Sequence, residues 1–147
     1  MKKDNTWKVL STCLVFCALL FSSCQKEITT ISEPVKNLTG TWKIIQLTRN
    51  GEDLTSRVDF SSFRISFNAD NSYTLQDQFM FFTTDPGTYS FDDPQYPFYL
   101  KFQPQNATSE TKLTFEYPIV KGQRQIKLKF SPGCTKNTYE YYFEKVQ

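Results

Sequence analysis

Pairs of carboxylates are the features of this 147-residue chain that come nearest to catalytic residues in type and spacing. The pairs are Glu52 with Asp53, Asp92 with Asp93, and Glu140 with Glu144. Two neighbouring carboxylates can act as acid and base when a glycosidic bond is cleaved. The first two pairs lie in turn sequences, where carboxylates usually cap backbone amides, and the third lies on the polar face of an alternating segment. We therefore expect no catalytic pair.

Histidine is absent from the sequence. Its absence removes Ser–His and Cys–His nucleophile pairs and the usual catalytic zinc sites. The segment NADNS (68–72) has acidic and amide residues, but it lacks the first Asp, the glycine and the closing Glu of a calcium loop, so it is interpreted as a hairpin turn. We expect a protein that is not an enzyme and has no catalytic residue, no metal ligand and no cofactor.

A cysteine at the end of an apolar run offers different chemistry, namely covalent attachment. The chain opens MKKDNTWK, continues with an apolar run from Val9 to Phe21, and turns polar after Cys24. A positive start followed by a short apolar run is typical of a secretory signal peptide, and the run is shorter than the roughly 20 residues of a membrane-spanning helix.

The stretch FSSC (21–24) resembles the lipobox of bacterial lipoproteins. The resemblance implies a diacylglycerol thioether on Cys24, cleavage between Ser23 and Cys24, and acylation of the new amino group, with palmitate as a typical fatty acid. Because Gln25 follows the cysteine in place of Asp, it also implies outer-membrane delivery, with the periplasmic or cell-surface face left open. A soluble secreted protein cut nearby and an uncleaved anchor are the alternatives.

Removal of residues 1–23 leaves 124 residues, enough for one domain. The leader holds three of the 17 basic and one of the 15 acidic residues, so 14 of each remain and the mature chain is neutral. A neutral chain without blocks of like charge gives no reason to expect nucleic acid. With Cys24 acylated, Cys134 has no internal disulfide partner and is either an inert thiol near a hairpin tip or half of an intermolecular bridge.

Three regions are predicted: a signal peptide (1–23), a lipid-anchored tether (24–36) and an all-β domain (37–147). In the last, short runs with apolar residues at every second position alternate with turn residues. This pattern predicts eight strands. One lies around TWKIIQLT, and each of the other seven has a set of apolar residues that faces inward. These sets are Phe63/Ile65/Phe67, Tyr73/Leu75, Tyr89/Phe91, Phe98/Leu100/Phe102, Leu113/Phe115/Tyr117, Ile126/Leu128/Phe130 and Tyr139/Tyr141/Phe143. We predict an eight-stranded antiparallel up-and-down β-barrel, with a two-sheet β-sandwich as the alternative.

The sequence NLTGTWKI (37–44) carries the Gly-x-Trp signature of the lipocalin-like fold as Gly40 and Trp42. The chain from about residue 37 to 146 resembles lipocalin-like domains of bacterial surface lipoproteins. The resemblance implies that Trp42 closes the base of the barrel, while Gly40 permits a close backbone approach. Lipocalins usually supply an Arg from the chain's end to cover this Trp; here Lys145 is the nearest cation.

The mature chain is rich in aromatic residues, with 12 Phe, 8 Tyr and one Trp. Most of them are explained as core, because a barrel of this size has just enough interior for side chains to fill. In QFMFFTT, however, Phe79 and Phe81 face one side and Met80 and Phe82 the other, so one apolar pair must point outward. Tyr99 and Tyr142 also lie opposite the inward-facing sets. These six residues form a candidate contact surface.

Two functions are consistent with these features. The first is a lipid-anchored, non-enzymatic binding module that takes a small apolar or amphipathic ligand. The second is an accessory lipoprotein that binds a protein partner or a glycan through exposed aromatic residues. In both cases Cys24 joins the protein to the membrane.

Overall fold

In the part of the chain that the structure describes, regular structure is entirely β, as the alternating sequence predicts. The computed structural model describes residues 32–77 and 83–147, and in them it shows no helix. The chain divides into the units Met1–Ser32 and Glu33–Gln147, and the second contains every strand. The strands are β1 (Gly40–Arg49), β2 (Glu52–Asp53), β3 (Arg64–Phe67), β4 (Ser72–Gln76), β5 (Gly87–Phe91), β6 (Tyr99–Pro104), β7 (Thr111–Glu116), β8 (Ile119–Val120), β9 (Gln123–Phe130) and β10 (Tyr139–Lys145).

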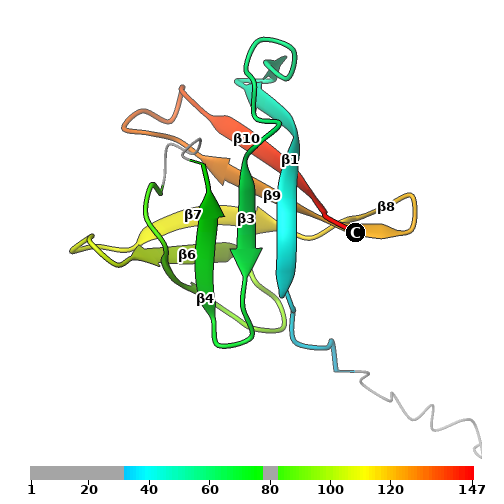
Figure 1. The fold of residues 1–147 in the computed structure, drawn as a ribbon, viewed down its shortest axis with the longest axis vertical. Helices are drawn as coiled ribbons and strands as arrows, with labels where there is room; N and C mark the ends of the chain where they lie inside the picture. Colours follow the sequence, from blue (N-terminus) through cyan, green and yellow to red (C-terminus); the bar gives the residue numbers. More distant parts are fainter. Residues whose placement is uncertain (1–31, 78–82) are drawn as a thin grey trace, which may run out of the picture. The chain divides into compact units, whose positions relative to one another are not determined.

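Eight of the strands form a closed antiparallel ring in the order β1, β3, β4, β5, β6, β7, β9, β10 (Figure 1). Each pairs with the next along the chain, and β10 closes the ring by pairing with β1 from Trp42–Lys145 to Arg49–Tyr139. A closed ring leaves no free sheet edge. The up-and-down barrel is therefore confirmed, its eight members match the eight predicted strands, and the sandwich is wrong.

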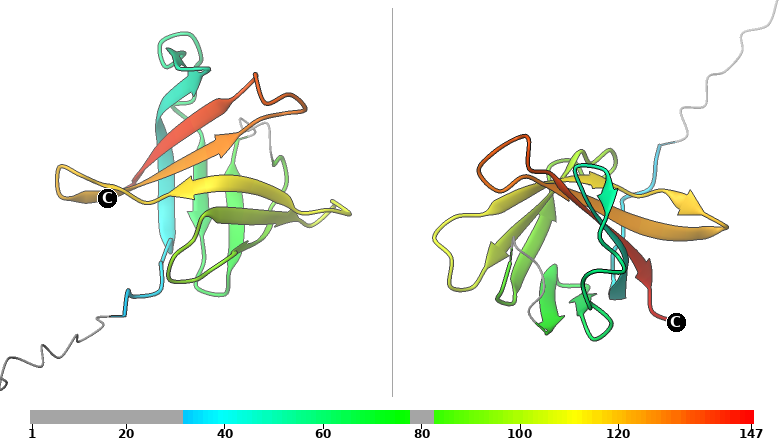
Figure 2. Two further views of the ribbon diagram at one scale, coloured as in Figure 1. Left: turned by 180° about the vertical axis from the view of Figure 1, so that it is seen from behind. Right: turned by 90° about the horizontal axis from the view of Figure 1, so that it is seen from above.

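Two short strands outside the ring were not predicted. β2 pairs with the end of β1 through Thr48–Asp53, and β8 pairs with the start of β9 through Ile119–Arg124. The β8–β9 hairpin projects from the barrel (Figure 2). Each is two residues long, too short to show the alternation that identifies a strand in a sequence.

The core lies inside the ring and receives side chains from all eight ring strands. Phe67 packs edge-on against Tyr89 at 4.8 Å between ring centroids, and Tyr73 packs edge-on against Phe102 at 5.1 Å. The other buried apolar residues are Leu38, Trp42, Ile44, Leu47, Phe63, Ile65, Leu100, Leu113, Phe115, Ile126, Leu128, Tyr141 and Phe143. The predicted inward sets are confirmed, with one exception.

The exception is Phe98, whose side chain is 71% exposed. Asp92 Oδ1 accepts the backbone N–H groups of both Phe98 (3.1 Å) and Tyr99 (2.9 Å), and β6 begins only at Tyr99. The carboxylate thereby fixes residue 98 in the loop, where its side chain no longer follows the inward face of the strand. The prediction for Phe98 was wrong because the loop chemistry of Asp92 overrides the period-two pattern.

Connections between strands alternate between the two ends of such a ring. One end, which we call the Trp42 end, holds the start of β1, the β3–β4 turn (68–71), the β5–β6 loop (92–98), the β7–β9 connection with β8 (117–122) and the C-terminus. At the β3–β4 turn, Asn68 N–H donates to Ser72 O and Asn71 has a φ of 63°, which confirms NADNS as a hairpin turn. The described residues contain no helix that could cross a membrane.

Candidate binding site

Trp42 covers one end of the barrel interior. The residue pairs with Ile65 of β3 and Lys145 of β10, and its side chain is buried. Its indole Nε1–H donates to Leu38 O at 2.7 Å, which satisfies the polar atom of an otherwise apolar ring. Leu38 is fully buried beside it. The indole thus joins the chain just before β1 to the end of the barrel.

The residues around Trp42 explain the glycine two positions earlier. Gly40 has a φ of 127°, and a Cβ there would overlap Lys145 Cε. The Lys145 side chain instead passes over Gly40, and its Nζ lies 6.0 Å from the centroid of the Trp42 ring. Lys145 therefore takes the place in which the resemblance expects an arginine, at the outer edge of cation–π range.

A second cation–aromatic pair stands next to the first. The Tyr117 ring is tilted against Trp42 at 6.2 Å, and Arg124 Cζ lies 5.1 Å from the Tyr117 centroid. Arg124 Nη1 donates to Tyr117 O at 2.8 Å, while the Tyr117 hydroxyl donates to Asn37 O at 3.0 Å. Burial raises the pKa of Tyr117, and the positive charge of Arg124 only partly opposes this. A cavity of about 410 Å³ lies against these residues.

Residues 33–39 cross the same end as a strap. Lys36 N–H donates to Pro94 O at 2.9 Å, which ties the strap to the β5–β6 loop. The hydrogen bond from the Tyr117 hydroxyl to Asn37 O ties the strap to the β7–β9 connection as well. Glu33 and Lys36 form an ion pair within the strap, and this pairing lowers the pKa of the Glu33 carboxyl.

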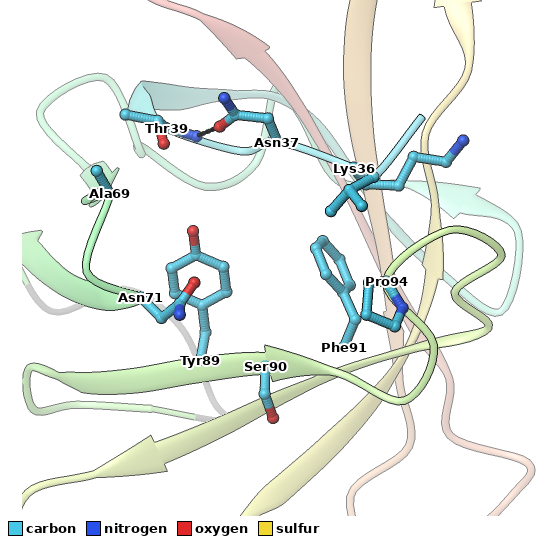
Figure 3. Close-up of a pocket in the computed structure, with 10 residues that line it drawn as sticks. Lys36, Asn37, Thr39, Ala69, Asn71, Tyr89, Ser90, Phe91 and Pro94 are labelled. Atoms are coloured by element: carbon cyan, nitrogen blue, oxygen red, sulfur yellow. Dashed lines mark hydrogen bonds between the residues drawn. The ribbon is translucent and has the colours of Figure 1, made fainter. Parts of the chain in front are cut away.

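A cavity of about 600 Å³ lies between the strap and β5. Figure 3 shows Tyr89 and Phe91 projecting from β5 toward residues 36–39. The other lining residues are Val35, Lys36, Asn37, Thr39, Ala69, Asn71, Ser90 and Pro94. Two aromatic rings thus form the apolar part, with the Asn71 amide and the Tyr89 hydroxyl beside them, while the Lys36 ammonium and the Ser90 hydroxyl point away (Figure 3).

Hydrogen bonds define the polar part of this cleft. Asn37 Oδ1 accepts Thr39 N–H at 2.8 Å, an Asx turn that shapes the strap. The Tyr89 hydroxyl lies 3.4 Å from Asn68 O, a long hydrogen bond. Burial, with a smaller effect from the nearby charge of Asp70, raises the pKa of Tyr89, so its hydroxyl stays neutral; with its proton directed at Asn68 O, its oxygen can accept a hydrogen bond from a bound group.

The contact-surface residues predicted from sequence are not gathered in this cleft. Tyr99 lies on the outer face with Lys112 Nζ 3.6 Å from its ring centroid. Tyr142 is half-buried on the outer face, where its hydroxyl donates to Glu140 at 2.9 Å. Cys24, Ser23, Phe79, Met80, Phe81 and Phe82 lie outside the described residues.

The carboxylate pairs have structural partners. Asp93 Oδ1 accepts the N–H groups of Gln95 and Tyr96, and Asp53 accepts that of Thr55, as expected for turns. Glu52 pairs with Arg57, Glu140 with Lys127 and Lys129, and Glu144 with Lys43. Cys134 is a free, exposed cysteine in the β9–β10 connection.

Sequence reasoning did not find the cleft, because its walls come from segments assigned to a tether and to turns. The available signal was the presence of Asn37, Thr39 and Gly40 shortly before Trp42. These residues favour a defined backbone conformation in the segment that leads into β1. Nothing in the sequence indicated that Ala69 and Pro94 line the same cavity.

The sequence pattern that defines the domain of unknown function DUF5004 matches residues 22–144. The chain belongs to this family. The match leaves out the apolar run Val9–Phe21 and includes Cys24, the cleft and all of the ring except Lys145, the last residue of β10. No curated protein and no solved structure matches the chain.

Proposed function

We propose that this DUF5004 protein is a lipid-anchored, non-enzymatic, lipocalin-like binding module of the outer membrane that takes a small amphipathic ligand. The observation that carries the proposal is the cleft of about 600 Å³ between the strap and β5. Ligand sites in proteins are usually concave, have volumes of about 300–1,000 Å³, and combine apolar walls with a few polar groups. The cleft meets each of these criteria.

The lining indicates the ligand's chemistry. Tyr89 and Phe91 offer ring faces to an apolar or ring-shaped portion. Asn71 and the Tyr89 hydroxyl offer neutral hydrogen-bonding groups, whereas the Ser90 side chain points away from the cavity (Figure 3). Lys36 is already paired with Glu33, so the cleft favours a neutral polar end over a strongly anionic one.

The anchor is supported by the FSSC sequence and by the extent of the family match. A match that starts at residue 22 is consistent with a removable leader followed by a mature chain that begins at Cys24. A protein with two or more acyl chains is held stably at a bilayer. The lipocalin-like assignment is supported by the closed ring together with Gly40 and Trp42 at its base.

Native mass spectrometry of residues 25–147, after incubation with extract of the source cells, tests the ligand. We expect a discrete added mass of a small molecule. Ala69→Trp, which places an indole in the cleft, should abolish the addition. Ala107→Trp is the matched control, because it changes an exposed alanine in a turn at the opposite end. A bare mass, or loss of the addition in both variants, would contradict the cleft; a protein-sized addition would favour the accessory role.

The anchor is tested separately on the full chain. Mass spectrometry of the membrane-extracted protein should show a diacylglycerol thioether and an N-acyl chain on Cys24. Cys24→Ser should shift the protein out of the membrane fraction, whereas Cys134→Ser should not. An unmodified Cys24 would refute the lipid anchor and leave the cleft proposal standing.

A further inference from the structure

Large exposed apolar side chains gather at one end of the barrel. Among the described residues, all of those at least 36% exposed lie at the Trp42 end. We call them the apolar rim: Val35, Tyr96, Phe98, Tyr99, Ile119, Val120 and Val146. The described connections at the opposite end, residues 50–63, 105–110 and 131–138, contribute none; the β4–β5 connection at that end includes residues 78–82, which lie outside the described residues. Single exposed apolar residues are normal on a protein surface, whereas several that share one region mark a contact site.

The rim is built from separate projecting segments. Val35 belongs to the strap, Tyr96 and Phe98 to the β5–β6 loop, and Ile119 and Val120 to the β8–β9 hairpin that stands out from the barrel (Figure 2). Protein–protein interfaces usually have a continuous core that is poor in charge. Here, in contrast, Lys121 and Arg124 share the hairpin with Ile119 and Val120.

Aromatic and aliphatic tips interspersed with lysine and arginine fit the interfacial layer of a bilayer, where long cationic side chains keep their charge at headgroup level. Lys145 lies at the same end and adds a further cation. The acidic residues of the β5–β6 loop, Asp92 and Asp93, have their carboxylates turned to backbone amides of their own loop. They therefore oppose contact with a lipid surface less than free carboxylates would.

The chain also enters the barrel unit at this end. Nine residue steps lead from Cys24 to Glu33, and a fully extended peptide spans at most about 3.6 Å per residue, so the tether is at most about 32 Å long. If Cys24 carries the acyl chains, this length keeps the Trp42 end within reach of the lipid surface.

We propose that the apolar rim docks on the surface of the lipid bilayer, so that the Trp42 end and its cleft face the membrane. The proposal rests on the lipid anchor of the proposed function for its tethering, but not on any ligand in the cleft. It goes beyond anchoring because it assigns membrane contact to the barrel's own residues.

An artificial tether separates this proposal from the chemistry of Cys24. The chain contains no histidine, so a hexahistidine tag before Gln25 makes a unique attachment to vesicles that contain nickel-chelating lipids. Tryptophan is introduced as Phe98→Trp in the rim or as Ser109→Trp in the β6–β7 loop at the opposite end. Fluorescence is compared between vesicles with brominated and with unbrominated acyl chains, and the contribution of Trp42 is subtracted using the unsubstituted protein.

We expect bromine to quench the Phe98→Trp signal and to leave the Ser109→Trp signal unchanged. Because the tag itself holds the Trp42 end near the lipid, a flexible Gly/Ser insertion after Ser32 provides the decisive comparison. Quenching that persists with the long tether shows that the rim binds the bilayer, whereas quenching lost on lengthening reflects tethering alone and overturns the proposal.

A second variant tests the rim residues themselves. Tyr96→Ser combined with Ile119→Ser alters exposed side chains, so the fold should survive, as checked by urea unfolding. In the long-tether protein this variant should lose the Phe98→Trp quenching. Retained quenching would overturn the proposal, as would a soluble dimer that depends on Tyr96 and Ile119 and shows no quenching on vesicles.

Discussion

The side chain of Lys145, at the end of β10, passes over the α-carbon of Gly40, at the start of β1, and brings its ammonium group to 6.0 Å from the Trp42 ring centroid. This contact joins the first and last strands of the ring at the point where they close it. It gives the Gly-x-Trp motif a physical meaning, because the glycine leaves room for the cation that covers the tryptophan.

Gly40→Ala should therefore destabilise the barrel through two effects. A φ of 127° is strained for any residue with a Cβ, and the new Cβ would overlap the Lys145 side chain. We expect a loss of about 1–3 kcal/mol in the free energy of unfolding, measured by urea titration. Gly51→Ala is the matched control, since its φ is 83° and nothing lies within 4 Å of the added Cβ.

Removing the lysine side chain distinguishes the two effects. If overlap contributes, Gly40→Ala combined with Lys145→Ala should be more stable than the sum of the single changes predicts. Equal losses in Gly40→Ala and Gly51→Ala, with no coupling to Lys145, would show that the contact over Gly40 has no energetic role.

The sequence predicted the ring because each of its eight strands has an apolar pair or triplet at alternate positions. In Phe63–Phe67 and Ile126–Phe130, for example, one face is apolar throughout, and it is buried inside the ring except at Phe130, which is partly buried. Closure could be expected because a sheet of this size with one apolar face must cover that face and its edges. Local alternation was thus enough to predict eight strands, and the Gly-x-Trp motif of Gly40 and Trp42 favoured a barrel over a sandwich.

The site could not be predicted in the same way. The cleft depends on residues 35–39 folding back over the barrel end, and this follows from single hydrogen bonds such as Lys36 to Pro94 and Tyr117 to Asn37. Bonds between distant segments leave no periodic signal in the sequence. Phe98 shows the same limit, since one carboxylate, that of Asp92, moved it out of the predicted face.

Tyr117→Phe should loosen the strap without unfolding the barrel. The change removes the hydrogen bond to Asn37 O and leaves the ring packed against Trp42. We expect faster tryptic cleavage after Lys36, with the free energy of unfolding lowered by no more than about 1 kcal/mol. Tyr99→Phe is the control, because the Tyr99 ring faces Lys112 on the outer surface. An unchanged cleavage rate would mean that the Tyr117 hydroxyl does not hold the strap.

Tyr73 and Thr83 form a buried hydrogen bond of 2.7 Å between hydroxyl groups. Thr83 Oγ1 also donates to Asp85 O at 3.1 Å, so its own proton is used there and Tyr73 acts as the donor. Tyr73→Phe should lower the free energy of unfolding by about 0.5–1.5 kcal/mol, and Thr83→Val should cost about 1–3 kcal/mol because it leaves the tyrosine hydroxyl without this acceptor. Urea unfolding of both single variants and the double variant should show positive coupling, and strict additivity would contradict the bond.

Glu140 is the centre of an ion-pair network on the outer face of β7, β9 and β10. Its carboxylate lies 3.0 Å from Lys129 Nζ, 3.4 Å from Lys127 Nζ and 2.9 Å from the Tyr142 hydroxyl. Partial burial opposes ionisation, but the hydrogen bonds from Lys129 and Tyr142 and the charges of both lysines outweigh it, so the pKa of Glu140 lies below its usual value of 4.5.

A lowered pKa fixes the direction of the pH effect. The folded protein binds the Glu140 proton less tightly than the unfolded chain does, so its contribution to stability is complete above the usual value of 4.5 and is lost as the pH falls through the lowered pKa. Glu140→Gln should therefore be less stable than the wild type at neutral pH, by roughly 0.5–1 kcal/mol, and the difference should shrink as the pH falls below 4.5 and through the lowered pKa. Urea titrations at pH 7, 5 and 3 measure the difference.

Glu110→Gln is the matched control, because Glu110 pairs with Lys101 across 3.4 Å and is more exposed to solvent. Its stability difference from the wild type should stay small at every pH. A Glu140→Gln difference that is the same at pH 7 and pH 3 would mean that the lost stability comes from the shape of the amide and not from the charge of the carboxylate. A difference that widens on acidification would contradict the lowered pKa itself.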